Sequence, residues 1–525
     1  MTSSAITPYA IEPVAALPID TNLAEALLVS MAEYSAQLHG RRIWLACSGG
    51  RDSLALAALC VQLYHQNRLP FLPQLLHVDH GLQDDSRQWA AHVENWAYKQ
   101  QMPCHILHAQ VTGHDEQAAR QARYDVMRAH MNQDDVLLLA HHADDQAETI
   151  LMRLIQGAGV NGLSGMQPWR VQMQGAHRIV LWRPWLTIKR ASISAYAKRL
   201  KLPYIDDPTN ETGDNIRSGL RRDIMPILAK YNPNVIDNMA RSAQLLSNAE
   251  ATVRAQAAQD MQQVAIASLQ LPSAQRVLNI DKLTALPEYR KRQLLHHWLG
   301  QDEPLPPTKQ LIDDVLRLSQ RNDHDHQTAL FWQGRKHAYT IRRYRQRLYR
   351  LSAQWLAWLN TPLTNQTNLI HRLNLADNNS LKTALEPITL RTNKDFVWQL
   401  KIRPQALASL WSTDKSGITL ETVLRITPLD RKQRLKTAFS THSQSGKKLY
   451  QLLGIPLWLR ESLVMVSVAL VNGNNLEQNE SDPSKEIPIL LLSPFDSWIL
   501  RSDELISRIS LSELIENDLR PSHTP

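Results

Sequence analysis

Short apolar runs that each precede a segment of helical periodicity are the feature of this sequence that most constrains its fold. Four such runs are IWLAC (43–47), QLLHV (74–78), HILHA (105–109) and VLLLA (136–140). Predicted helices span 53–66 and 85–101, with Trp89, Val93, Trp96 and Gln100 on one stripe, and a third carries Ala147, Ile150, Leu151, Leu154 and Ile155. Strands separated by helices pair in parallel, because a parallel pair needs a long crossover connection. We therefore predict an α/β fold with a doubly wound parallel sheet over residues 39–232.

The chain is too long for a single core, since domains usually run about 100 to 200 residues. From Asn234 to about Gln320 the strand patterns give way to helical ones, and an alternating basic stretch follows. The predicted organisation is an N-terminal extension (1–38), the sheet domain (39–232), a small helical domain that ends in a basic hairpin (233–358) and a C-terminal α+β domain (380–525). The polar residues 360–379 are predicted to form a linker.

The composition excludes several classes of protein. Hydrophobic residues make up 43% and charged residues 21% of the 525 positions, which excludes wholesale disorder. The three cysteines, Cys47, Cys60 and Cys104, lack the paired spacing of disulfide, zinc or iron–sulfur frameworks. No run reaches the roughly 18 apolar residues of a membrane span, and the N-terminus lacks the pattern of a signal peptide. We expect a cytoplasmic protein that does not bind membranes. Its net charge of +8 suits a polyanionic binding partner.

The sequence ACSGGRDS joins the first predicted strand to its helix through a glycine-rich turn. Such a turn exposes backbone N–H groups and a helix N-terminus in one concavity, which binds anions. Gly49 and Gly50 leave room for an anion beside the backbone. Ser48 and Ser53 can donate to phosphate oxygens, and Asp52, which would repel phosphate directly, suits Mg²⁺. The alternative is a plain strand-to-helix turn with a capping serine.

A second polar segment, AHHADDQAET, follows the fourth strand, at the carboxyl edge where open α/β sheets bind ligands. It carries His141, His142, Asp144, Asp145 and Glu148. The carboxylates can share Mg²⁺ or steer a nucleophilic amine, and a histidine can orient them or move a proton. The alternative is an acidic first turn stabilised by the helix dipole. That alternative explains the carboxylates but not two adjacent histidines.

These segments resemble a known family. SGGxDS after a first strand is similar to the signature of the PP-loop ATPases, which have an adenine-nucleotide-alpha-hydrolase-like fold and release pyrophosphate from ATP; LLHVDHGL (75–82) resembles the element on the adenine side of their pocket. HHxDDQxET resembles the tRNA(Ile)-lysidine synthetases in particular. Further matching segments are AARQARYDVM (118–127), RPWLTIKRASISAYAKRLKLPYIDDPTN (183–210) and SGKKLYQLLGIPLWLRESLVMV (445–466). The segment RSGLRRDIMPIL departs from that family, because Ser218 stands where an asparagine is usual.

The resemblance implies a reaction and a set of site residues. ATP would adenylate O2 of the wobble cytidine in an isoleucine tRNA with a CAU anticodon, and the amine of free L-lysine would then attack C2, giving lysidine, AMP and pyrophosphate. The implied ATP-binding residues are Ser48, Gly49, Gly50, Arg51, Asp52, Ser53, His77 and Asp79. The implied catalytic residues are Asp52, His141, Asp144, Asp145 and Glu148, with Mg²⁺ at Asp52 and Asp145. The implied contacts to tRNA or lysine are Arg120, Arg123, Asn210, Arg217 and Arg221, for which surface salt bridges are the alternative.

The family resemblance also implies that the helical domain binds substrate and that the C-terminal domain binds tRNA. Between Arg335 and Arg350 there are seven basic residues and no acidic ones, interleaved with tyrosines 339, 344 and 349. Such a mixture is typical of RNA-binding surfaces, where aromatic rings stack on bases. The alternative is a solvated hairpin whose tyrosines pack inward.

Two other functions stay open. A tRNA-thiolating PP-loop enzyme would use the same fold, but related enzymes carry cysteine pairs that this chain lacks. A non-catalytic RNA-binding protein would have no need of the intact carboxylates. The sequence leaves the oligomeric state open, a homodimer included.

Overall fold

The computed structural model divides the chain into two compact units, Met1–Thr252 and Val253–Pro525. The residues that it describes are 12–79, 86–110, 116–174, 177–205, 216–266, 277–321, 328–364, 369–374, 386–403, 420–429, 432–435, 437, 442–472, 487–494, 496–500 and 515–521. Within these ranges, no helix has both the length and the apolar content that crossing a bilayer requires.

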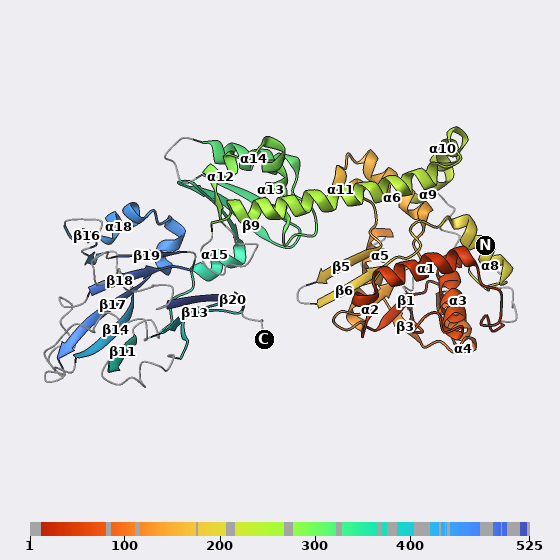
Figure 1. Ribbon diagram of the computed structural model, residues 1–525, viewed down its shortest axis with the longest axis horizontal. Helices are drawn as coiled ribbons and strands as arrows, with labels where there is room; N and C mark the ends of the chain where they lie inside the picture. Colours follow the sequence, from red (N-terminus) through yellow and green to blue (C-terminus); the bar gives the residue numbers. More distant parts are fainter. Residues whose placement is uncertain are drawn as a thin grey trace. The chain divides into compact units, whose positions relative to one another are not determined.

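A six-stranded sheet forms the centre of the first unit, with its strands in the order β3–β2–β1–β4–β6–β5 (Figure 1). The strands are β1 (Ile43–Ala46), β2 (Gln74–Asp79), β3 (Cys104–His108), β4 (Val136–Leu138), β5 (Trp169–Gln174) and β6 (His177–Trp182). β1 pairs in parallel with β2 and β4, and β3 and β6 extend the sheet in parallel, whereas β5 runs antiparallel to β6 at one edge. The predicted α/β fold with a parallel sheet is confirmed, and all four predicted strands are present.

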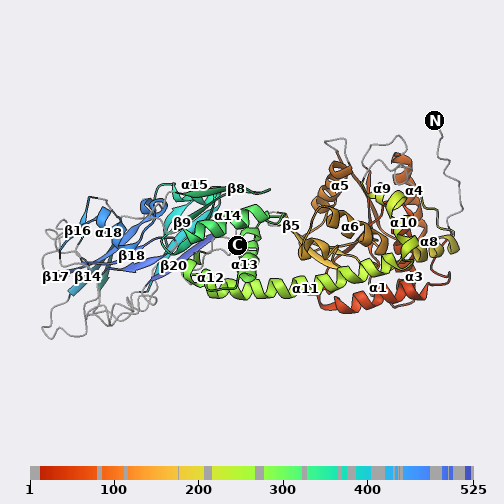
Figure 2. The same cartoon turned by 90° about the horizontal axis from the view of Figure 1, so that it is seen from above.

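Helices cover both faces of this sheet. They are α1 (Thr21–Glu33), α2 (Ser35–Leu38), α3 (Arg51–His65), α4 (Ser86–Lys99), α5 (Glu116–His130), α6 (Ala143–Ile155), α7 (Val160–Leu163), α8 (Arg190–Arg199), α9 (Ile216–Gly219), a π-helical turn (Leu220–Ile224), α10 (Met225–Tyr231) and the first part of α11 (Val235–Val264). Neighbouring residues of a strand point to opposite faces, so Leu45 packs in the core with α1 and α3 while Trp44 packs in the core with α5. Figure 2 shows α1 and α3 on one side of the sheet and α5 on the other. Burial on both faces explains why the predicted strands read as continuous apolar runs.

The predicted N-terminal extension packs into the first unit through a buried amide. Gln62, on α3, donates through Nε2 to the carbonyl oxygens of Val14 (3.1 Å) and Leu17 (3.0 Å). Its Oε1 accepts a hydrogen bond from the hydroxyl of Tyr196 on α8 (2.6 Å). One side chain therefore connects the N-terminal segment, α8 and the helix that begins at the glycine-rich turn.

The second unit begins with helices and a four-stranded antiparallel sheet, β7–β10–β9–β8. It continues with a five-stranded sheet, β11–β14–β17–β18–β19, a three-stranded one, β12–β13–β20, and the pair β15–β16. Its helices are α12 (Ile280–Thr284), α13 (Glu288–Gly300), α14 (Lys309–Gln320), α15 (Ala353–Leu359), α18 (Gly446–Leu453) and a 3₁₀ helix (Leu457–Ser462). Its strands are β7 (Leu278–Asn279), β8 (Ala329–Gln333), β9 (Ala338–Tyr344), β10 (Arg347–Ser352), β11 (Leu369–Asn374), β12 (Ile388–Thr392), β13 (Phe396–Ile402), β14 (Leu420–Pro428), β15 (Arg434–Leu435), β16 (Gln444–Ser445), β17 (Val464–Asn472), β18 (Ile487–Leu492), β19 (Ser497–Ile499) and β20 (Ile515–Pro521).

Two expectations for this unit have different outcomes. The alternating basic stretch forms the antiparallel strands β8, β9 and β10, which confirms the predicted hairpin. The predicted linker is wrong in part, because β11 lies within it and pairs with β14. The sequence of β11, LIHRLN, is short and lies between polar residues, and its partner β14 is distant in the sequence, so no local pattern shows the pairing.

Replacing the buried amide should destabilise the first unit. In Gln62→Leu, the carbonyl of Leu17 and the hydroxyl of Tyr196 lose the hydrogen bonds of a buried side chain, while the carbonyl of Val14 keeps the one from the N–H of Leu17 (3.0 Å). We expect the free energy of unfolding to fall by about 2–4 kcal/mol, since each buried polar group left unpaired costs about 1–3 kcal/mol. Urea unfolding followed by circular dichroism measures this, with Gln88→Leu, at an exposed position of α4, as the matched control. Equal stability of the two variants would contradict the connecting role of Gln62.

Candidate functional site

The glycine-rich turn between β1 and α3 is closed by its own side chains. The backbone N–H of Ser48 donates to Oγ of Ser53 (3.2 Å), and the N–H of Gly50 donates to Oγ of Ser48 (3.2 Å). Oγ of Ser53 in turn donates to the carbonyl oxygen of Gly50 (3.0 Å). Gly49 has φ +81°, and a Cβ there would lie 3.0 Å from the side chain of Val93 on α4. Both the backbone conformation and the close packing therefore require glycine at this position.

A segment that follows α8 covers this turn. The backbone N–H of Ile205 donates to the carbonyl oxygen of Gly49 (3.0 Å). Arg51, in the first turn of α3, donates to Oγ of Ser194 (2.9 Å), and its guanidinium lies 5.0 Å from the ring centroid of Tyr204. Arg51, which the sequence predicts as an ATP-binding residue, thus also fixes the covering segment.

Two cavities meet at the turn. We call the larger one, of about 350 Å³, the strand-end cavity, and the smaller one, of about 200 Å³, the acidic cavity. The residues that line both are Ser48, Gly50, Asp52, Ser53 and Ile205. The strand-end cavity is also lined by His77, Asp79, Arg120, Arg123, Tyr124 and His141. The acidic cavity is also lined by Arg51, His142, Asp145, Arg190 and Arg221. Most of the predicted site residues therefore meet at one edge of the sheet.

His142 lies among three carboxylates at the N-terminus of α6. The carboxylate of Asp145 accepts a hydrogen bond from the backbone N–H of His142 (3.1 Å). Nε2 of His142 lies 3.5 Å from Asp145 and 3.6 Å from Asp52, and Nδ1 lies 3.6 Å from Asp144. Burial by itself lowers the pKa of His142, but the carboxylates outweigh it, so the pKa is raised above its ordinary value. The carboxylates therefore keep the imidazolium form of His142 to a higher pH than in an ordinary histidine, and this form offsets the repulsion among them. The neutral form accepts the backbone N–H of Asp145 at Nδ1 (3.4 Å).

Asp52 presents an unused carboxylate oxygen to this cluster. Its Oδ2 lies 3.6 Å from Nε2 of His142 and 3.9 Å from Nε of Arg190, while its Oδ1 is buried and has no hydrogen-bond partner among the described residues. Burial raises the pKa of Asp52, but the hydrogen bond and charge of His142, with the charge of Arg190, lower it by more. An ionised carboxylate with a buried free oxygen fits a hard cation such as Mg²⁺.

Asp144 and Glu148 are paired within the protein. The carboxylate of Asp144 accepts the backbone N–H of Arg190, the first residue of α8 (2.8 Å). Glu148, with 2% of its surface exposed, accepts two hydrogen bonds from Arg221 (2.7 and 3.0 Å). Burial raises the pKa of Glu148, and Arg221 offsets only part of this rise. Asp144 thus fixes the start of α8, and Glu148 fixes Arg221 at the wall of the acidic cavity.

The predicted residues on β2 lie at the opposite wall. Nδ1 of His77 lies 2.9 Å from the carbonyl oxygen of Cys47, so the imidazole donates from that nitrogen. The carboxylate of Asp79 lies 3.6 Å from Nδ1 of His108 on β3. Both side chains are buried and line the strand-end cavity.

The residues predicted to contact tRNA or lysine do not all lie at the cavities. Arg217 donates to Oγ1 of Thr149 on α6 (3.3 Å) and lines neither cavity among the described lining residues. Ser218, which replaces the usual asparagine, is buried. Asn210 lies outside the described residues.

Sequence reasoning missed Arg190 and Ile205 as cavity residues. Arg190 belongs to a segment that had been matched to the family, but its apolar periodicity carries no signal for a side chain that faces Asp52. Ile205 reaches the turn only because the chain folds back after α8. The π-helical turn that carries Arg221 was not predicted. One signal for it is Pro226, just after the turn, because proline lacks an N–H group and its ring clashes with the carbonyl four residues earlier, which disturbs a regular helix there.

In the second unit, the basic hairpin turns its aromatic residues inward. The buried tyrosines are Tyr339, Tyr344 and Tyr349. The expectation that they stack on RNA bases is therefore wrong, because both faces of the hairpin are covered. Tyr344 and Tyr349 belong to one hydrophobic core, and Tyr339, on the opposite face, stacks on Trp332 (5.1 Å between ring centroids). Arg350 is also buried, with its guanidinium 4.1 Å from the ring centroid of Tyr339, and Arg347 pairs with Asp496 (2.7 Å). Arg335 and Lys336 stay exposed at the turn between β8 and β9.

Two regions of this chain match models of known protein families. A family model described as "PP-loop domain" matches residues 23–228, and one described as "TilS substrate binding domain" matches residues 278–349. The tRNA(Ile)-lysidine synthase of Psychrobacter sp. (strain PRwf-1) is 39% identical over 95% of this chain and 98% of its own length. Those of Pseudomonas aeruginosa and Pseudomonas fluorescens are 38% and 34% identical, over 55% and 70% of this chain and 64% and 82% of their own lengths.

The conformation of the turn predicts the effect of adding one methyl group. Gly49→Ala should weaken ATP binding about tenfold, because a left-handed residue other than glycine costs about 1 kcal/mol and the new Cβ also displaces Val93 beside the turn. Equilibrium dialysis with labelled ATP measures the dissociation constant. Gly40→Ala is the matched control, since Gly40 has φ +71° and open space around it. Equal ATP affinity in the two variants would show that the turn does not hold the nucleotide.

Proposed function

This chain belongs to the tRNA(Ile)-lysidine synthase family, and we propose that it joins free L-lysine to C2 of the wobble cytidine in an isoleucine tRNA with a CAU anticodon. It is an ATP-dependent ligase of tRNA modification that forms a carbon–nitrogen bond. The observation that carries the proposal is the pair of cavities that share the glycine-rich turn. One has apolar walls that suit a nucleotide base, and the other places two carboxylates, those of Asp52 and Asp145, beside three arginines, a mixture that suits phosphates and an amine together.

The first step is adenylation of the cytidine. O2 of the base attacks the α-phosphorus of ATP, an O–P bond forms, and pyrophosphate leaves. The backbone N–H groups at the start of α3, with the hydroxyls of Ser48 and Ser53, would hold the phosphates. Leu76, Met127 and Leu139 form apolar walls of the strand-end cavity that would contact the adenine ring.

Asp52 and Asp145 would hold Mg²⁺ at the edge that the two cavities share. The free Oδ1 of Asp52 is buried, and the carboxylate of Asp145 lies beside it across His142. When bound, Mg²⁺ neutralises charge on the phosphate oxygens and on the leaving pyrophosphate. Arg221, 3.9 Å from Asp145, adds a fixed positive charge to the same wall.

The second step consumes lysine. Its side-chain ammonium first releases a proton to solvent. The resulting amine attacks C2 of the adenylated base, the C2–O bond breaks, AMP leaves with the electron pair, and the nitrogen releases a second proton to solvent. The carboxylates of Asp52 and Asp145 would hold the ammonium group before its first proton leaves, while the arginines that line the same cavity would hold phosphate oxygens. Glu148 contributes less to this attraction, because Arg221 already neutralises it.

The chemistry of the cysteines favours a ligase over a thiolating enzyme. Sulfur transfer needs a thiolate, and a buried thiol is inert. Among the described lining residues of the two cavities there is one cysteine, Cys47, in the strand-end cavity. Burial raises the pKa of its thiol to about 11. At neutral pH it is a buried thiol that packs beside the turn.

The test is incorporation of labelled lysine into an unmodified isoleucine tRNA transcript with a CAU anticodon, in the presence of ATP and Mg²⁺. We expect labelling of this transcript and none of a methionine tRNA with the same anticodon. ATP cleavage to AMP without labelled RNA would contradict lysine as the nucleophile. Labelling of both transcripts would contradict the proposed tRNA selectivity.

Asp52→Ala separates catalysis from RNA binding in the same assay. The variant should lose labelling while its affinity for the transcript stays within a few-fold, because Asp52 lies at the phosphate turn. Glu94→Ala, at an exposed position of α4, is the control. Unchanged labelling in Asp52→Ala would rule out its role at the metal and phosphates.

Mg²⁺ affinity should rise with pH. His142 has a raised pKa, so below that pKa an imidazolium lies beside the carboxylates that would bind the metal. Deprotonation removes this competing charge, and the affinity should increase by up to about tenfold per pH unit until His142 is neutral. Calorimetric titration from about pH 6 to about pH 9 measures the effect, and His142→Gln should abolish it. An affinity of the unmodified protein that does not change over this range would contradict the competition.

A further inference from the structure

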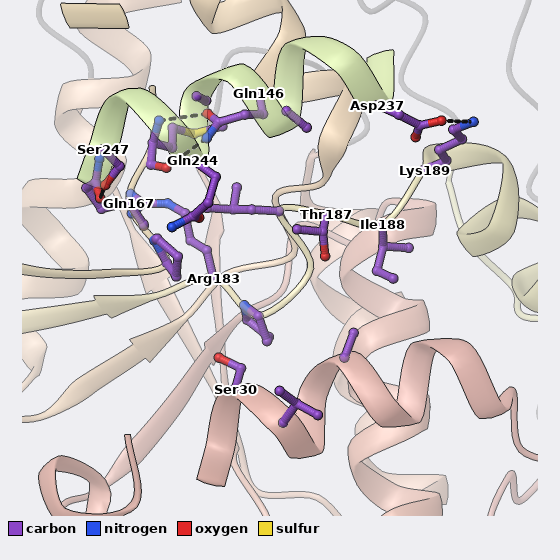
Figure 3. Close-up of a pocket in the computed structure, with 18 of the residues that line it drawn as sticks. Ser30, Gln146, Gln167, Arg183, Thr187, Ile188, Lys189, Asp237, Gln244 and Ser247 are labelled. Atoms are coloured by element: carbon purple, nitrogen blue, oxygen red, sulfur yellow. Dashed lines mark hydrogen bonds and ion pairs between the residues drawn. The ribbon is translucent and has the colours of Figure 1, made fainter. Parts of the chain in front are cut away.

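Arg183 separates the strand-end cavity from another, larger cavity in the first unit. This rear cavity has a volume of about 560 Å³ and lies between α1, α11 and the loops that flank β5 and β6 (Figure 3). The side chain of Arg183 is buried, lines the rear cavity and reaches His141 at the wall of the strand-end cavity. Arg183 therefore connects the rear cavity to a residue that lines the strand-end cavity.

The hydrogen bonds of Arg183 determine which nitrogen of His141 carries its proton. Nε of Arg183 donates to Nδ1 of His141 (3.3 Å), and Nη1 donates to the carbonyl oxygen of Gln167 (3.0 Å). Arginine has no acceptor atom, so Nδ1 of His141 must be the acceptor and the proton lies on Nε2. Burial lowers the pKa of His141 well below its ordinary value, and the charges of Arg183, Arg120, Arg217 and His142 lower it further.

The segment that holds Arg183 is fixed from two helices. Oγ of Ser247 on α11 donates to Oε1 of Gln167 (2.7 Å), and Nε2 of Gln167 donates to the carbonyl oxygen of Ser164 (3.2 Å). From α6, Gln146 makes two hydrogen bonds with the backbone of Met166 (2.9 and 2.7 Å). Figure 3 shows Ser247, Gln167 and Arg183 together at one end of the rear cavity. The carbonyl that receives Arg183 is therefore held in place by both helices.

We propose that Arg183 is a positioning residue that keeps His141 as its neutral Nε2–H tautomer, so that His141 donates a hydrogen bond into the strand-end cavity and does not act as a general base. A base would need a lone pair directed at the substrate, and the lone pair of His141 is directed at Arg183. A neutral donor is suited to an oxygen that gains negative charge during adenylation or AMP release. This role rests on the proposed function, which supplies those oxygens.

Two substitutions of His141 distinguish a donor from a base. Glutamine keeps an N–H donor that never titrates, whereas leucine keeps none. We expect His141→Gln to retain lysidine formation within about tenfold, and His141→Leu to lose about a hundredfold or more, since one preorganised donor is worth about 10²–10³ in rate. Equal losses in both variants, each of about 10²–10⁴, would identify a general base and overturn the proposal.

A second readout needs no activity, so it separates this inference from the proposed function. Nitrogen NMR of protein labelled in histidine reports the tautomer and the titration of His141, whose signal is identified by its loss in His141→Gln. In the unmodified protein we expect the Nε2–H tautomer without titration from about pH 6 to about pH 8. In Arg183→Gln we expect a mixture of tautomers and a pKa that moves toward the ordinary value.

Two further variants distinguish a change in the His141 tautomer from misfolding of the protein. Arg183→Lys keeps the buried charge but not the fixed pair of donors, and we expect it also to populate both tautomers. Arg178→Gln, a change of an exposed arginine on β6 that pairs with Asp134, should leave the His141 signal unchanged. An Nε2–H signal that stays unaltered in both Arg183 variants would overturn the proposal, whatever the outcome of the lysine assay.

Discussion

The charge cluster around His142 is the interaction on which the rest of the site depends. It brings Asp52 of α3 and the two aspartates of α6 within 3.6 Å of one imidazole, and Asp144 extends the cluster to the start of α8. Carboxylates this close repel one another strongly away from water. A ring whose pKa the carboxylates raise lowers that cost whenever it is protonated, and it holds the edge of both cavities together through contacts within the protein.

Adjacent residues in this cluster have different tasks because of helix and strand geometry. Successive residues of a helix point about 100° apart, so Asp144 faces the backbone of α8 while Asp145 faces the acidic cavity. At the end of β4, His141 points to the strand-end cavity and His142 to the acidic one. The first is surrounded by arginines and stays neutral, and the second is surrounded by carboxylates and favours the cation.

The same reasoning explains how the cavities stay distinct. Ile205 and the glycine-rich turn form a wall between them, and this wall exists because the backbone of Ile205 bonds to Gly49, where no side chain intervenes. On the far side, Arg183 closes the strand-end cavity against the rear cavity. Each boundary depends on a contact between segments that are far apart in the sequence.

The sequence by itself determined the parallel sheet, the glycine-rich turn and the meeting of two polar segments at one sheet edge, because apolar periodicity and glycine requirements are local properties. It also identified Asp52, Asp145 and His141 as residues of that edge. Only the tertiary structure decided that Asp144 and Glu148 are consumed by α8 and Arg221, that the hairpin tyrosines lie in a core, and that Arg183 and Ile205 bound the cavities. Those outcomes depend on partners from distant segments, and the distance and direction of such partners are set by packing, which no local pattern encodes.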